Sequence, residues 1–145
     1  MGVNNFKYTG IGLTKSFEGE KLTAYQDVGG VWTIGDGHTA GVKRGDVCTE
    51  AQADLWLLEE CQGAANVVNR LVTIVLTQHE FNALVDFVYN LGCGTFARSS
   101  LLKNLNAGHF EKVAANIEAY DIADGKHCAG LLRRRAAEVN EFFTV

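Results

Sequence analysis

Two carboxylic acids and one hydroxyl near the amino-terminal end of the sequence could do acid–base chemistry. Glu18 falls where a short predicted helix ends, directly after Phe17. The negative end of the helix dipole and an apolar neighbour both disfavour an ionised carboxylate, which suits a general acid. Asp27 falls in a glycine-rich segment whose backbone amides can favour a carboxylate, and Thr33 can hold a water beside it. A protonated acid and an ionised carboxylate are the pair that glycoside hydrolysis uses.

Around these residues the sequence predicts one short helix and a small sheet. The helix should run from about Gly10 to Phe17 or Glu18, with Thr9 as its N-cap. From residue 22 to 41, apolar residues alternate with turn-forming glycines, which is typical of an antiparallel sheet with tight turns.

The remainder of the sequence is typical of helices. Thr49 with Gln52, and Thr77 with Glu80, have the spacing of capping boxes, so a long helix should cover about 50–70 and an apolar one should follow Thr77. Further helices are expected at 99–107, 110–120 and 130–143. We therefore expect one α+β domain over 1–145, with a sheet lobe at about 10–48, a connecting helix at about 50–70 and a larger helical lobe at about 71–145. A cleft between two lobes is a usual place for a substrate.

Composition excludes several classes of protein. With 13 basic and 17 acidic residues among 145, the net charge of −4 argues against nucleic acid as the main partner. No apolar run approaches the ~18 residues of a membrane span, so membrane insertion is not expected. The amino-terminal residues lack the pattern of a signal peptide.

The cysteines give no metal-binding pattern. Cys48, Cys61, Cys93 and Cys128 are scattered without a C-x-x-C pair, which argues against zinc. We expect free and mostly buried thiols. A Cys93–Cys128 or Cys48–Cys61 disulfide would form only in an oxidising compartment.

The spacing of the three site residues matches a known pattern. Asp27 follows Glu18 by nine residues and Thr33 follows Asp27 by six, whereas Glu20 is only seven residues from Asp27. The flanking F-E-G, A-Y-x-D, G-V-W-T-I-G and G-H-T match as well, and so does the run from Gly130 to Glu138. In these motifs the sequence resembles the family-24 glycoside hydrolases, the bacteriophage lysozymes known as endolysins or muramidases. The resemblance covers about residues 10–143.

The resemblance implies a lysozyme-like fold and cleavage of the β-1,4 bond between N-acetylmuramic acid and N-acetylglucosamine in peptidoglycan. Glu18 would protonate the leaving oxygen, while Asp27 with Thr33 would activate a water on the opposite face of the sugar, giving inversion. Four further residues match positions that face the sugar in the family: Tyr89, Asn90, Ser100 and Asn116. They could equally be ordinary polar residues of helices.

The resemblance also implies no metal or cofactor, and a monomer that is made in the host cytoplasm and reaches the wall through a holin lesion. One arginine of the segment Arg133 to Arg135 would approach the catalytic Glu, although the same segment could be a solvated helix face. His38 is more simply a structural residue of the sheet.

Asp36 departs from the family, which has an uncharged residue there. If Trp32 to His38 form a strand, alternation places Asp36 on the His38 face and away from Thr33, and this is the arrangement we expect. If the strand bends at its glycines, Asp36 would instead approach the cleft as a third carboxylate.

Two other functions remain to be distinguished from the hydrolase. A lytic transglycosylase would cut the same bond with a Glu but no water-activating carboxylate, leaving a 1,6-anhydro sugar. A non-catalytic wall-binding module could keep the fold alone. The presence of Glu18, Asp27 and Thr33 together favours the hydrolase.

Overall fold

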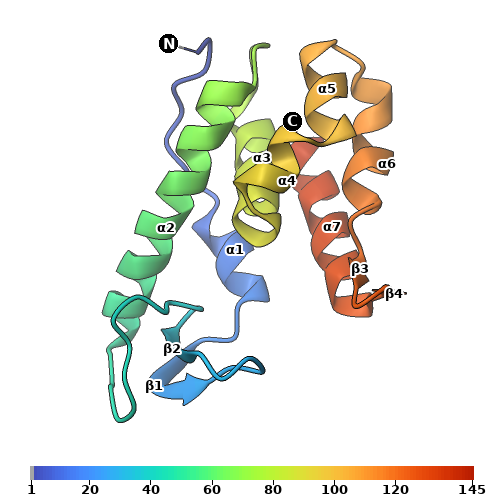
Figure 1. The fold of residues 1–145 in the computed structure, drawn as a ribbon. Coiled ribbons are helices and arrows are strands. Elements are labelled where there is room, and N and C mark those ends of the chain that lie inside the picture. The colour runs from blue at the N-terminus through green and yellow to red at the C-terminus, as the bar shows by residue number, and fades with distance from the viewer. Residues whose placement is uncertain (1) are drawn as a thin grey trace. The chain divides into compact units, whose positions relative to one another are not determined.

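The computed structural model describes residues 2–145, and the chain divides into two compact units (Figure 1). The small unit comprises residues 11–61. The large unit comprises the residues up to Gly10 together with residues 62–145. No helix among residues 2–145 combines the length and apolarity that crossing a membrane requires.

The small unit begins with helix α1 (Ile11–Phe17) and continues into a two-stranded antiparallel sheet of β1 (Lys21–Gln26) and β2 (Trp32–Gly35). Tyr25 lies opposite Thr33 in this sheet. A bridge from Thr23 to Val47 adds a third segment to it, so the predicted helix and sheet are both present.

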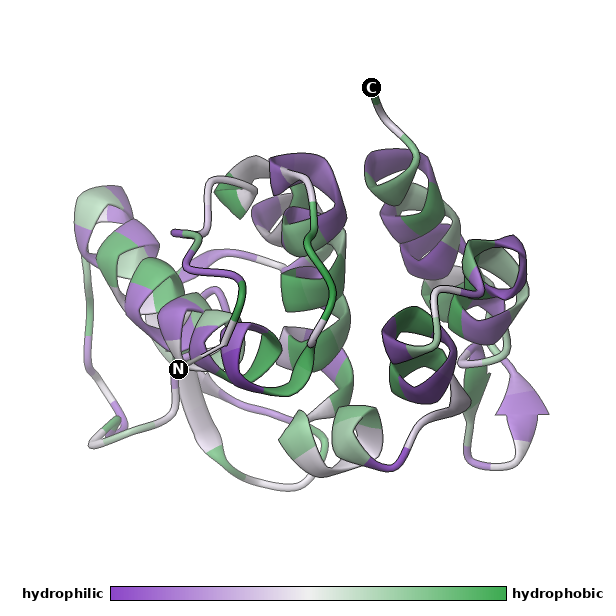
Figure 2. Ribbon diagram, turned by 90° about the horizontal axis from the view of Figure 1, so that it is seen from above, coloured by the Kyte–Doolittle hydropathy of each residue, from purple (hydrophilic) through white to green (hydrophobic). Residues whose placement is uncertain are grey.

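Helix α2 (Glu50–Leu71) is the long helix expected at about 50–70. Its first turn is capped as predicted, because the Thr49 hydroxyl accepts a hydrogen bond of 3.1 Å from the Gln52 amide. Hydrophobic and hydrophilic residues alternate along it (Figure 2). The division between the two units falls within this helix, after Cys61.

The core of the large unit lies where α3 (Gln78–Leu91) packs on α7 (Ala129–Phe142). The capping box of Thr77 and Glu80 is present with both of its hydrogen bonds. Phe81 and Phe87 of α3 and Phe142 of α7 are among the largest fully buried side chains. Burial of such a side chain stabilises the fold by roughly 1.5–3 kcal/mol.

The other elements of the large unit differ from the prediction in part. Helix α5 (Ser100–Asn106) is where it was expected, whereas the helix predicted at 110–120 is divided into η1 (Phe110–Lys112) and α6 (Val113–Glu118). The sequence did not indicate α4 (Cys93–Ala97) or the hairpin of β3 (Ile122–Ala123) and β4 (Lys126–His127).

Two smaller predictions are wrong. Thr9 does not cap α1, because its hydroxyl accepts a hydrogen bond of 2.8 Å from the Asn82 side chain. All four cysteines are free, as expected, but only Cys61 is buried.

Charged side chains form a buried network between α3 and α7. Arg134 donates two hydrogen bonds, of 3.0 and 2.9 Å, to the carboxylate of Asp86. Arg135 donates bonds of 2.8 Å to both Glu138 and Asn90. Arg134 and Arg135 are buried and only Arg133 is exposed, so a solvated face is the wrong interpretation for two of the three arginines.

Burial and the neighbouring Asp86 raise the pKa of Glu138 from about 4.5 to about 10. The folded protein therefore keeps this carboxyl protonated at neutral pH, whereas the unfolded chain releases the proton above about pH 4.5. The contribution of this group to stability is complete below pH 4.5 and is lost as the pH rises towards 10.

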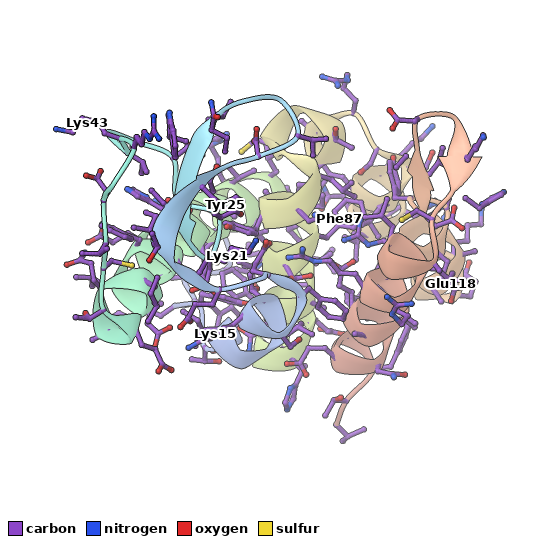
Figure 3. All side chains as sticks on the ribbon, turned by 90° about the horizontal axis from the view of Figure 1, so that it is seen from below. Lys15, Lys21, Tyr25, Lys43, Phe87 and Glu118 are labelled. Atoms are coloured by element: carbon purple, nitrogen blue, oxygen red, sulfur yellow. The ribbon has the colours of Figure 1, made fainter. Side chains whose placement is uncertain are left out.

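We expect Glu138→Gln to flatten the dependence of the free energy of unfolding on pH. The variant cannot ionise, so between pH 5 and 9 its slope should differ from that of wild type by up to about 1.4 kcal/mol per pH unit. Urea unfolding at pH 5, 7 and 9 measures this slope. Glu118→Gln is the control, because Glu118 is exposed on α6 (Figure 3). Parallel curves for wild type and Glu138→Gln would show that Glu138 is ionised in the fold.

Candidate active site

Asp27 organises the turn that joins β1 to β2. Its Oδ1 accepts hydrogen bonds of 2.9 Å from the backbone amides of both Gly29 and Val31. Gly30 completes the turn with a φ of 80°, a conformation that glycine adopts readily. The carboxylate is therefore held in one orientation by the backbone of its own turn, although its residue is exposed. Among residues 2–145, no hydrogen bond is made to its second oxygen, Oδ2.

Thr33 is fixed to the same turn through Val31. The Thr33 hydroxyl donates a hydrogen bond of 2.9 Å to the backbone carbonyl of Val31. The backbone amide of Val31 in turn donates to the Asp27 carboxylate. The backbone amide of Asp27 also donates to that carbonyl, at 2.9 Å. Since the hydroxyl hydrogen is used in this way, the Thr33 hydroxyl can take part in further hydrogen bonds only as an acceptor. The peptide groups of Val31 thus bring together two of the three residues predicted to do chemistry.

Glu18 lies directly after the last residue of α1, where the sequence predicted it. Its amide donates a hydrogen bond of 3.2 Å to the Lys15 carbonyl, which continues the helix by one tightened turn. The residue is half-buried and belongs to the small unit together with Asp27 and Thr33.

The four residues predicted to face the sugar lie on three helices of the large unit. Tyr89 and Asn90 are half-buried on α3, and the Asn90 carbonyl oxygen accepts from the buried Arg135. Ser100 is exposed at the start of α5, and Asn116 on α6 accepts a bond of 2.7 Å from Asn104.

Asp36 does not lie in a strand, so the expected alternation of faces does not apply. Strand β2 ends at Gly35, and the chain turns through Gly35 and Gly37, whose φ angles are 67° and 99°. Asp36 is 2% exposed, and its carboxyl lies within 4.8 Å of those of Glu20 and Asp54. The alternative in which the strand bends at its glycines describes this segment better than the one we expected.

His38 has the structural role that the sequence indicated. Its amide and carbonyl pair with those of Ile34 across the turn, at 2.9 Å in both directions. Its ring stacks on Trp56 with the centroids 4.2 Å apart, and Nδ1 lies 2.8 Å from a carboxylate oxygen of Glu60.

Sequence reasoning missed a cluster of carboxylates around Lys15. The Lys15 ammonium lies 2.6 Å from Asp54, 3.2 Å from Glu50 and 3.2 Å from Glu20. The spacing of Glu50 and Asp54, one turn apart on α2, was the only available signal, since nothing local connects them to Lys15.

Burial, and then the charge of Glu20, raise the pKa of Asp36 to about 6. Asp54 and Glu18 act in the same direction, and Lys15 acts against them. Hydrogen bonding to Asp54 is the largest factor that raises the pKa of Lys15. Because the ammonium already supplies positive charge among these carboxylates, the cluster gives no ground for a metal site.

A cavity of about 510 Å³ lies in the large unit, and none of the predicted site residues lines it. Its lining includes Asn5, Asn66, Asn69, Arg70 and Thr73.

Comparison with known proteins identifies the family to which the chain belongs. Residues 15–138 match the family model described as phage lysozyme. The endolysin of Acyrthosiphon pisum secondary endosymbiont phage 1 is 38% identical over 89% of this chain and 91% of its own length. The endolysin of Bacillus phage B103 is also 38% identical, over 97% of this chain, which spans about half (54%) of that relative.

Among solved structures, the muramidase domain of SpmX from Asticaccaulis excentricus superposes with a TM-score of 0.90 at 35% identity. The superposition covers 98% of this chain and all of that domain (100%). The predicted α+β lysozyme fold is therefore confirmed, and the chain belongs to the phage lysozyme family.

Proposed function

We propose that this chain is an endolysin in which Glu18, Asp27 and Thr33 carry out the hydrolysis. As a phage lysozyme it is a glycoside hydrolase, a muramidase. Its substrate is bacterial peptidoglycan, in which it cleaves the β-1,4 bond between N-acetylmuramic acid and N-acetylglucosamine, and its role is lysis of the host cell.

The observation that carries the proposal for the water-activating side is the shared use of Val31. The side chains of Asp27 and Thr33 are both hydrogen-bonded to the backbone of this residue, so they are held in a fixed position relative to each other. Asp27 Oδ2 is available to take a proton from water, and the Thr33 hydroxyl can accept a hydrogen bond from the same water. Together the two side chains can hold and activate a nucleophilic water.

In this proposal Glu18 is the general acid, and Asp27 is the base that acts on the other face of the sugar. The half-buried position of Glu18 after α1, at the negative end of the helix dipole, suits a carboxylic acid that donates its proton. That proton goes to the glycosidic oxygen as the bond to the anomeric carbon breaks. Water attacks this carbon from the other face, and Asp27 takes the proton that the water loses.

This division of labour is that of an inverting glycosidase. Inversion requires the two carboxyl groups to be roughly 6.5–9.5 Å apart, so that a water fits between Asp27 and the sugar. The product is a free reducing end of inverted configuration, and no covalent intermediate forms. No metal or cofactor has a part in this mechanism.

Binding of the glycan would draw on Tyr89, Asn90, Ser100 and Asn116. An aromatic ring can stack on a sugar face, and amides and hydroxyls can bond to N-acetyl groups. Asn90 is the best fixed of them, because Arg135 holds its carbonyl oxygen and leaves its amide hydrogens available as donors. The enzyme would act on the wall as a monomer, after release through a holin lesion.

Glu18→Gln should reduce wall lysis by about 10²–10⁴-fold or more, because an amide cannot donate the catalytic proton. Clearing of permeabilised Gram-negative cells measures activity, and circular dichroism checks the fold. Glu59→Gln is the matched control, because Glu59 is exposed on α2. Clearing at the wild-type rate by a folded Glu18→Gln variant would contradict the assignment.

Asp27→Asn should be impaired to a similar degree, because the variant cannot accept a proton from water. For the wild-type enzyme, NMR of the first product from soluble peptidoglycan fragments should show the α-anomer of a reducing sugar. A β-anomer would indicate retention, and a 1,6-anhydro sugar would indicate a lytic transglycosylase. A protein that binds the wall and releases no sugar would be a binding module only.

A further inference from the structure

The cavity of about 510 Å³ in the large unit lies where the amino-terminal segment runs beside the end of α2 (Figure 1). The segment lines it with residues 2–5, and α2 lines it with Asn66, Asn69 and Arg70. Thr73, just after the helix, completes the lining. The volume is in the range of roughly 300–1,000 Å³ that is usual for small-ligand sites, and the proposed reaction leaves this cavity without a role.

Hydrogen bonds hold two walls of the cavity in place. The Asn4 side chain is buried, and it donates to and accepts from the backbone of residues 74–76, at 2.8 and 3.0 Å. Asn69 is bonded in the same two-way manner to the backbone of Phe6, at 3.1 and 3.3 Å. The backbone of Gly2 lies so close to the Asn69 carbonyl oxygen that a Cβ would not fit between them. The cavity is therefore formed before any ligand arrives.

Other polar groups of the lining are not used in holding the walls. Among residues 2–145, the Arg70 guanidinium, the Asn5 side chain and the Thr73 hydroxyl have no hydrogen-bond or ion-pair partner. The Asn66 carbonyl oxygen accepts a bond of 3.0 Å from Gln62, which leaves the amide hydrogens of Asn66 available as donors. Arg70 is the one charged residue that the described part of the chain contributes to the lining. The cavity thus offers a single positive charge beside neutral donors and acceptors.

This set of groups fits a neutral polar ligand that carries one carboxylate. A guanidinium pairs with a carboxylate through two parallel hydrogen bonds. Side-chain amides and hydroxyls match the hydroxyl and N-acetyl groups of amino sugars. Ligands with several phosphates favour several cations, which this lining does not provide. Peptidoglycan has the required combination, because its acetylated sugars carry a carboxylate on the lactyl group or, once that group is linked to peptide, on the peptide.

We propose that this cavity is a second binding site for peptidoglycan, which takes an N-acetylated sugar with a carboxylate on its lactyl group or on its peptide. Arg70 binds the carboxylate, and Asn66 and Thr73 bind the sugar. The inference rests on peptidoglycan as the substrate, and not on the residues proposed to cleave it. Because a glycan strand repeats the same units, binding at one site raises the local concentration of wall at the other. The enzyme is therefore retained on the wall between successive cuts.

NMR titration of the isotope-labelled protein with three probes tests this site. N-acetylmuramic acid has its carboxylate on the sugar, its L-alanyl-D-isoglutamine derivative has one on the peptide, and N-acetylglucosamine has none. None of the probes contains the bond that the enzyme cleaves, so binding is measured independently of catalysis. We expect the amide resonances of residues 66–73 to shift, and at least one acidic probe to bind about 10-fold or more tightly there than N-acetylglucosamine. The acidic probe that binds identifies the source of the carboxylate.

Two variants separate the charge from the amide. Arg70→Gln removes the cation from an exposed position of α2, so the acidic probes should then bind no more tightly than N-acetylglucosamine. Asn66→Ala should weaken all of the probes alike, because it removes a donor to groups that they share. Arg98→Gln is the matched control, since Arg98 is exposed in the same unit and does not line the cavity. Asn66→Ala and the comparison of probes on wild type still test the site if Arg70→Gln does not fold.

The inference is overturned if no probe shifts the resonances of residues 66–73, or if Arg70→Gln keeps the wild-type preference for an acidic probe. A change in melting temperature alone would assign Arg70 only the role of offsetting the dipole at the end of α2. The proposed function fails separately, because an active Glu18→Gln variant would contradict the catalytic assignment and leave the binding results unchanged. An inactive Glu18→Gln beside a cavity that binds no probe removes only the second site.

Discussion

The two hydrogen bonds that Asp27 Oδ1 accepts from the amides of Gly29 and Val31 determine the geometry of the small sheet. They close the turn, and the closed turn sets the register that places Thr33 opposite Tyr25. The same bonds leave one carboxylate oxygen for chemistry. The turn residue and the proposed general base are thus one side chain, so the local fold and the proposed reaction cannot be changed independently at this position.

In the large unit, a buried network of charged side chains has a similar organising role. Arg134 neutralises Asp86 through a bidentate pair, while Glu138 keeps its proton and accepts a hydrogen bond from Arg135. Arg135 also donates a hydrogen bond to the side chain of Asn90. Breaking such a network by removing one partner leaves a buried charge without compensation, which typically costs 3–5 kcal/mol. The position of a proposed sugar-binding amide therefore depends on the packing of α3 against α7.

The sequence predicted best those features that depend on neighbours along the chain. The N-terminal cap of α2 and that of α3 could each be predicted from a threonine and a residue three positions later. The turn at Asp27 could be predicted from the glycines that follow it. Spacing alone could not reveal that Lys15 meets Asp54, because 39 residues separate them and no periodic pattern connects them. Asp36 was misplaced because the alternation rule holds only within a strand, and β2 ends at Gly35.

Buried charge was the other source of error. Arg135 and Glu138 are fully buried, whereas the usual position of such residues is at the surface, which is why a solvated helix face was one of the two interpretations of the three arginines. Tertiary partners such as Asp86 and Asn90, which the spacing of the arginines does not reveal, explain why two of the three lie inside.

The proposed site combines two kinds of interaction that respond differently to dissolved salt. The Asp27 turn is held by hydrogen bonds within a few residues, which salt hardly affects. The Lys15 cluster is held by ion pairs at half-exposed side chains, and at physiological ionic strength charges are screened over about 8 Å. Outside the cytoplasm the ionic medium varies with the environment of the cell. The turn that carries the proposed base is therefore insulated from that medium, while the cluster around Lys15 is exposed to it.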